Sequence, residues 1–169
     1  MINKVKKIII PTFLKKYFIF SHFKVVNIDR LYVCLINSNL GNIKYVNIKK
    51  TPHYYFVCEY LGIKNKHEEN TINYNDYINS NPLDPRSKEK FIQLIDSINK
   101  NGYNFKELPI LVFKTIKRPL PYGRYDVADG FHRLSILTAL DSKNVNVAVI
   151  KRRQSIFMRL KKRLLNAIK

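Results

Sequence analysis

Residues 127–140, with the sequence VADGFHRLSILTAL, carry side chains suited to binding an anion. The pattern predicts the end of a strand, a tight turn at Gly130, and a helix with His132 and Arg133 in its first turn. A helix N-terminus presents unpaired backbone N–H groups and a partial positive charge. With the Ser135 hydroxyl, these groups form a predicted receptor for phosphate. The alternative is an ordinary strand–turn–helix with polar residues at its exposed entrance.

Two acidic residues complete the chemistry that phosphoryl transfer requires. This reaction needs positioning, charge neutralisation and a carboxylate near the attacking hydroxyl. Asp84 precedes a predicted helix and Asp129 ends a predicted strand, so both are expected at the end of the sheet where α/β folds gather ligands. Arg86 adds a further cation. Structural alternatives remain open: Asp84 closes a turn, Asp129 caps a helix, and Arg86 is a surface charge.

The elements that must position these residues follow from the hydrophobic pattern. Four apolar residues between 91 and 98 have helical spacing, which predicts a helix over 86–101 with Ser87 as its N-cap and Gly102 at its end. The other predicted elements are strands over 24–28, 32–36, 43–48, 109–113, 125–128 and 145–150, a hairpin turn at 37–42, helices over 53–62 and 131–140, and a loop over 64–75.

These elements predict a single α/β (α+β) domain over residues 25–150, with a small mixed sheet flanked by helices, since 169 residues can bury one core. Outside it, residues 1–24 form a basic extension and residues 151–169 a basic amphipathic helix. In the N-terminal extension we expect an interfacial helix broken near Pro11. In the C-terminal helix an apolar residue recurs at every fourth position, at Ile156, Leu160, Leu164 and Ile168.

The net charge of +19 is concentrated at the two ends of the chain. Residues 1–24 hold six lysines and no acid, and residues 151–169 hold eight lysines or arginines and no acid. Three interpretations stay open: solvated charges, contact with an anionic membrane surface, and binding of nucleic acid. For the C-terminal helix, packing against its own domain is the further alternative.

Cysteine usage and hydropathy indicate the compartment. Cys34 and Cys58 lie among apolar residues and resemble buried thiols in a reducing environment. The cysteines and histidines lack metal-ligand spacing, so no metal ligands are predicted. Pro11 interrupts the apolar run that follows the first lysines, and no segment approaches the ~20 apolar residues of a membrane span. We expect a cytoplasmic protein, with the inner face of the membrane as a surface its basic ends can contact.

Several short segments between residues 81 and 150 occur in an order known from one superfamily. They are NPLDPR at 81–86, SI at 97–98 with Gly102, PILV at 109–112 and DGFHR at 129–133. In this series the chain resembles the ParB/sulfiredoxin superfamily, which implies a ParB N-terminal-like fold for the recognisable core, residues 81–150. The likeness covers roughly 70 residues and does not extend to the first half of the chain.

Within that superfamily the motifs are most similar to those of the free serine kinases. Sulfiredoxins carry a reactive cysteine where this chain has Phe131, and chromosome-partitioning ParB proteins add a DNA-reading domain that is not visible here. The resemblance implies that Asp84, where the kinases have Glu, is the general base. It also implies that Asp129 orients the hydroxyl or assists metal binding, while His132 and Arg133 hold the transferred phosphate.

The predicted function is therefore a nucleotide-dependent kinase acting on a hydroxyl of a small molecule, such as an amino acid or a polysaccharide building block. The expected cofactor is a nucleoside di- or triphosphate, ATP or ADP, with Mg²⁺. A ParB-like nucleotide- or nucleic-acid-binding module without catalysis is the alternative. The predicted catalytic residues are Asp84 and Asp129, the phosphate- and nucleotide-binding residues are Arg86, Gly130, Phe131, His132, Arg133 and Ser135, and the substrate-binding residues are His53 and Tyr77.

Overall fold

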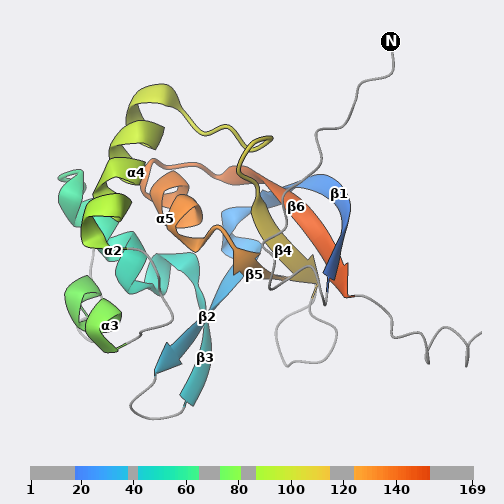
Figure 1. The fold of residues 1–169 in the computed structure, drawn as a ribbon, viewed down its shortest axis with the longest axis horizontal. Helices are drawn as coiled ribbons and strands as arrows, with labels where there is room; N and C mark the ends of the chain where they lie inside the picture. The colour runs from blue at the N-terminus through green and yellow to red at the C-terminus, as the bar shows by residue number, and fades with distance from the viewer. Residues whose placement is uncertain (1–17, 38–41, 65–72, 81–86, 115–123, 153–169) are drawn as a thin grey trace, which may run out of the picture.

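Within the described part of the chain, six strands form one mixed sheet with helices packed on it (Figure 1). The computed structural model describes residues 18–37, 42–64, 73–80, 87–114 and 124–152. The strands are β1 (Phe18–Asn27), β2 (Leu31–Asn37), β3 (Asn42–Asn47), β4 (Ile110–Lys114), β5 (Tyr125–Asp129) and β6 (Asn144–Arg152). The helices are α2 (Pro52–Tyr60), α3 (Tyr74–Ser80), α4 (Lys88–Asn101) and α5 (Phe131–Ala139), with 3-10 turns η1 (Ile28–Arg30) and η2 (Ile48–Lys50). The predicted mixed α/β class is confirmed.

The sheet runs in the order β1-β6-β4-β5-β2-β3. The pairs β1–β6, β4–β5 and β2–β3 are antiparallel, whereas β4–β6 and β2–β5 are parallel. The predicted hairpin is confirmed in the pairing of β2 with β3. Since β4 and β5 lie in the middle of the sheet, the turn after β5 is surrounded by regular structure.

Capping residues explain where the helices begin. The Thr51 hydroxyl accepts a hydrogen bond from the backbone N–H of Tyr54 at 3.2 Å, and Pro52 occupies the first turn of α2. Ser87 caps α4 as predicted, and Gly102 ends that helix at a φ of 76°. The predicted helices α2, α4 and α5 therefore occur within two residues of their expected bounds.

The main core lies between the helices and one face of the sheet. In Figure 1 the helices gather beside the sheet, and α5 packs against β4 as well as against α2 and α4. This layer buries apolar side chains that would otherwise contact water, which is the main stabilising contribution to such a fold. Its fully buried members include Ile28, Leu31, Ile48, Val57, Phe91, Ile95, Ile110, Leu134, Ile136 and Val147.

A second, smaller cluster lies on the opposite face of the sheet. Leu111, Ala148 and Ile150 are buried there, with partly buried phenylalanines packed against them. Consecutive strand residues point to opposite faces, so β4 and β6 contribute apolar side chains to both sides. The middle of the sheet is therefore apolar on two faces.

Two predicted segments differ from the structure. Residues 18–24 belong to strand β1 and not to a helical extension, so the predicted boundary after residue 24 falls inside a strand. Pairing with β6 explains this, because Phe18 and Phe20 pack against the second cluster. The predicted loop over 64–75 is also wrong at its end, since Asn73 accepts a hydrogen bond from the N–H of Asn75 and starts α3.

Residues 1–17 of the predicted N-terminal extension and residues 153–169 of the basic helix predicted over 151–169 lie outside the described residues, while residues 151 and 152 belong to β6 and not to a helix. In the part of the chain that is described, none of the helices has both the length and the apolar character needed to cross a membrane.

Substitutions at Gly130 and Gly62 test how closely the start of α5 packs against β4. Both have positive φ, 90° and 65°, which costs ~1–2 kcal/mol for a residue with a side chain. A Cβ at Gly130 would also lie 2.9 Å from Ile110 Cα, whereas nothing lies within 4 Å of one at Gly62. In urea unfolding we expect Gly130→Ala to destabilise the protein by ~1–3 kcal/mol more than Gly62→Ala. Equal losses would contradict the close approach of α5 to β4.

Candidate functional site

The predicted strand–turn–helix is present at the end of β5. Gly130 is the N-cap residue of α5, with a left-handed backbone at φ 90° and ψ 21°, and no side chain caps the helix. The first backbone N–H groups of an α-helix have no intrahelical acceptor. The structure thus places the positive end of the α5 dipole at the end of a central strand.

Gly130 is required here for steric reasons as well as for its backbone angle. A Cβ at this position would lie 2.9 Å from Ile110 Cα and 3.2 Å from a terminal nitrogen of Arg133. No side chain fits between the start of α5 and the start of β4 without displacing one of them. Ile110 and Arg133 therefore lie close against the backbone of this turn, on the side where a side chain would otherwise stand.

Arg133 is held by two protein acceptors. Nη1 donates to the backbone oxygen of Leu108 at 2.7 Å, and Nη2 donates to Asp129 Oδ2 at 3.3 Å. The Arg133 side chain is 13% exposed and that of Asp129 is 39% exposed. An anion that used the same donor nitrogens would have to replace these partners, whereas the more exposed Asp129 carboxylate can reach solvent.

Tyr103 anchors the same segment. Its hydroxyl donates to the Leu108 oxygen at 2.6 Å, so this one carbonyl accepts from both Tyr103 and Arg133. Burial raises the pKa of Tyr103 to about 12, while the positive charge of Arg133 opposes that rise. The turn before β4 is therefore tied to the start of α5 through a single carbonyl oxygen.

His132 points into a cluster of aromatic rings. Its Nε2 lies 3.5 Å from the Tyr74 hydroxyl, and its ring centroid lies 4.5 Å from Phe91 and 4.7 Å from His53. The interplanar angles with Phe91 and His53 are 87° and 80°, an edge-on arrangement that suits aromatic quadrupoles. Because these contacts come from α2, α3 and α4, packing fixes the orientation of the His132 ring.

The two predicted substrate residues join this cluster but do not line an open surface. The His53 ring lies 4.0 Å from Phe131 and 5.0 Å from Tyr77. His53 is fully buried and Tyr77 is 8% exposed. The structure therefore brings His53, Tyr77, Phe131 and His132 together, with the first two beneath the helix that carries the others.

Ser135 departs from the prediction. It is fully buried, and its hydroxyl donates to the backbone oxygen of Phe131 at 3.1 Å, within the helix. A serine at this position satisfies its donor one turn back along the helix. The Ser135 hydroxyl is thus absent from the predicted phosphate receptor. Asp84 and Arg86, the other predicted members of the site, lie outside the described residues.

Two residues near the site were not predicted as functional neighbours. Tyr103 follows a helix stop without a motif of its own, and Phe91 was identified only as a core residue of the amphipathic helix. Tyr74, which belongs to the same aromatic and polar segment of the sequence as Tyr77, packs against both His53 and Phe91.

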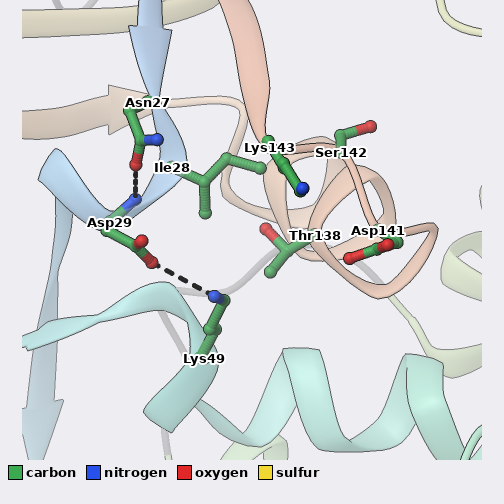
Figure 2. Close-up of a pocket in the computed structure, with 8 residues that line it drawn as sticks. All are labelled: Asn27, Ile28, Asp29, Lys49, Thr138, Asp141, Ser142 and Lys143. Atoms are coloured by element: carbon green, nitrogen blue, oxygen red, sulfur yellow. Dashed lines mark hydrogen bonds and ion pairs between the residues drawn. The ribbon is translucent and has the colours of Figure 1, made fainter.

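A polar cleft lies at the other end of α5 (Figure 2). It has a volume of about 230 Å³ and is lined by Asn27, Ile28, Asp29, Lys49, Thr138, Asp141, Ser142 and Lys143. An ion pair of 3.1 Å joins Lys49 and Asp29 across it. The nine residues of α5 separate this cleft from the Gly130 turn by about 13 Å, so it is distinct from the predicted site.

Comparison with models of known protein families and with curated proteins gave no match to this chain. In the described residues, no group of three or more His, Cys, Asp or Glu side chains could hold a metal ion. The site is therefore defined by its own geometry: an uncapped helix N-terminus, Arg133 beside Asp129, and a histidine held by aromatic rings.

Alkaline pH tests the anchoring of the turn by Tyr103. The folded protein keeps the Tyr103 proton up to about pH 12, whereas an unfolded chain loses it near pH 10. This contribution to stability is complete below about pH 10 and is lost as the pH rises toward 12. Tyr103→Phe should lower stability at neutral pH, because it removes a hydrogen bond, and should flatten the decline above pH 10. Unfolding free energies in denaturant from about pH 9 to about pH 11.5 measure both effects; an unchanged slope would contradict them.

Proposed function

We propose that this protein is a nucleotide-dependent phosphotransferase with a ParB/sulfiredoxin-type domain. It transfers a phosphoryl group to a hydroxyl of a small molecule, such as an amino acid or a polysaccharide building block. The observation that carries the proposal is the pairing of Arg133 with Asp129 at the uncapped N-terminus of α5. A cation, a carboxylate and the backbone N–H groups of a helix N-terminus at one point suit phosphoryl transfer.

The turn at Gly130 is the part that binds phosphate in this proposal. Backbone N–H groups of the first turn of α5 donate to phosphate oxygens, and Arg133 exchanges its internal partners for the anion. Asp129 then turns toward Mg²⁺, which prefers one or two carboxylates together with substrate phosphates. ATP or ADP is the proposed donor.

Transfer itself needs a base near the acceptor. In the proposed step, Asp84 takes the proton of the acceptor hydroxyl, whose oxygen forms a bond to the terminal phosphorus. The bond from that phosphorus to the bridging oxygen breaks, and the nucleotide leaves with one phosphate fewer. His132 donates to the transferred phosphate, and its contacts with the rings of His53 and Phe91 fix its orientation.

The net charge of +19 favours a second function, the binding of nucleic acid without catalysis. Lysine and arginine contacts to a phosphate backbone release counterions, so such binding weakens steeply with salt. Binding of a single nucleotide depends on far fewer charges. The slope of affinity against salt concentration therefore separates the two functions.

Arg133→Ala tests the phosphate-binding role. In calorimetry with Mg²⁺ and ATP or ADP, the loss of a charge-assisted contact should weaken binding by ~1.5–3 kcal/mol. Since Arg133 also holds the Leu108 carbonyl, Tyr103→Phe is the matched control: it removes the second bond to that carbonyl and keeps the cation. We expect the control to bind nucleotide almost as well as the wild type.

Two results would contradict this role. One is a wild-type protein that binds neither nucleotide. The other is a Tyr103→Phe variant that loses as much affinity as Arg133→Ala, which would assign the effect to the turn before β4. If, in addition, short DNA or RNA binds with a steep salt dependence, the nucleic-acid function replaces the kinase.

Asp84→Asn tests catalysis separately from binding. The amide keeps the size of the carboxylate but cannot accept the proton, so turnover should fall ~10²–10⁴-fold while nucleotide affinity changes little. His132→Ala should reduce both turnover and affinity, because the imidazole contacts phosphate before and during transfer. The assay follows transfer from labelled nucleotide to a panel of hydroxylated amino acids and sugars. Full turnover in Asp84→Asn would exclude Asp84 as the base.

A further inference from the structure

The face of the sheet opposite the helices carries an aromatic surface along β1. Strand pairing shows which residues share that face: Phe20 lies opposite Ile150, and Phe23 lies opposite Ala148. Ile150 and Ala148 belong to the second cluster, on the side away from α5. We call the apolar side chains on this side the phenylalanine face; they are Phe18, Phe20, Phe23, Val25, Phe105, Leu111, Phe113, Ala148 and Ile150.

The rings of this face contact one another. Phe20 and Phe23 have centroids 5.3 Å apart, and Phe23 meets Phe105 edge-on at 5.6 Å. Phe18 lies 5.5 Å from Phe113 on the neighbouring part of the sheet. An irregularity between Phe20 and His22 shifts the pairing of β1 by one residue. Because of this shift, Phe23 lies on the same face of the sheet as Phe20 and not on the face that the helices cover.

Part of this face is exposed. Phe23 is 37% exposed and Val25 is 60% exposed, although both lie in a regular strand. The described helices all lie on the opposite side of the sheet, where they cover the main core. A sheet with apolar side chains on both faces is normally covered on both. The phenylalanine face thus lacks its second layer among the described residues.

The chain contains a segment with the length and pattern of such a layer. Residues 153–169 follow β6 directly, and β6 is the neighbour of β1. Seventeen residues in a helix span about 26 Å, more than the ~10 Å across the three adjacent strands β1, β6 and β4 that carry the face. Their apolar residues recur at every fourth position, at Ile156, Leu160, Leu164 and Ile168. Pro11 interrupts any comparable stripe in residues 1–17.

We propose that residues 153–169 form an amphipathic helix that covers the phenylalanine face, with Leu160 and Leu164 packed against Phe23 and Val25. The basic side chains of the segment then point to solvent on the outer surface. In this arrangement the positive charges of residues 153–169 lie on the surface of the folded domain and not on a separate tail.

Because the chain contains no tryptophan, the fluorescence of one introduced tryptophan reports on its own position alone. Phe23→Trp places one indole on the phenylalanine face of the full-length protein. If the segment covers it, emission should be blue-shifted and poorly quenched by acrylamide. Adding Leu164→Asp should shift emission to longer wavelength, increase quenching, and raise the unfolding equilibrium constant by about tenfold or more, as loss of a buried leucine does. Asn166→Asp is the matched control on the opposite side of the helix and should change none of these.

Other occupants give different results, and each overturns the proposal. Emission that responds to Ile9→Asp and not to Leu164→Asp assigns the face to the N-terminal segment. Emission that depends on protein concentration assigns it to a second copy of the chain. Emission that shifts to the blue only when anionic phosphatidylserine vesicles are added assigns it to a membrane. Val25→Trp, at a more exposed position, repeats the measurement if Phe23→Trp does not fold.

Discussion

The close approach of α5 to β4 at Gly130 is the constraint on which the rest of the site depends. With no side chain at that position, the start of the helix comes within van der Waals distance of Ile110, a buried residue in the centre of the sheet. This contact fixes where the first turn of α5 lies and therefore where Arg133 and His132 can reach. The same backbone angle that a glycine adopts freely also turns the chain from strand into helix within one residue. The close contact at Gly130 therefore both packs α5 against the sheet and positions the side chains of the site.

The side chains at this helix start differ in how firmly they are held. His132 is enclosed by rings from three helices, so its position is set by packing. Arg133 is held by hydrogen bonds to a carbonyl oxygen and to a half-exposed carboxylate. Hydrogen bonds to partly exposed groups are exchanged for other partners at modest net cost, because water or a ligand can replace them. Arg133 is therefore the adjustable member of the site and His132 the fixed one.

Local signals in the sequence predicted the elements of this site well. The Asp-Gly turn and the apolar periodicity after it lie within a few residues, so they specify strand, turn and helix without knowledge of the rest of the chain. The burial of Ser135 also had a signal that was overlooked, since the residues around it, LSILTAL, are apolar on nearly every side of a helix. The contact of His53 with His132 had no signal in the sequence, because it depends on how α2 packs on α5.

Strand β1 could not be predicted in full from the sequence, for a different reason. Alternation of apolar and polar residues reveals a strand only if the alternation is unbroken, and the irregularity between Phe20 and His22 breaks it. The lysines in the same region suggested a basic extension with an interfacial helix. Lys24 is in fact bound into the sheet, where its amino group donates to the Tyr125 hydroxyl at 3.0 Å. Charge composition alone could not distinguish these two arrangements.

The pairing of β1 with β6, which lie more than 100 residues apart in the sequence, has a consequence for synthesis of the protein. Asn27 lies opposite Asn144 and Phe18 opposite Arg152, and β6 alone joins β1 to the rest of the sheet. Closing so long a loop carries an entropic cost that local contacts do not offset. On the ribosome, β1 emerges before β6 and has no strand to pair with until residues 144–152 have also been made. Its phenylalanines lack their sheet partners during that interval, when exposed apolar side chains make a nascent chain prone to aggregation.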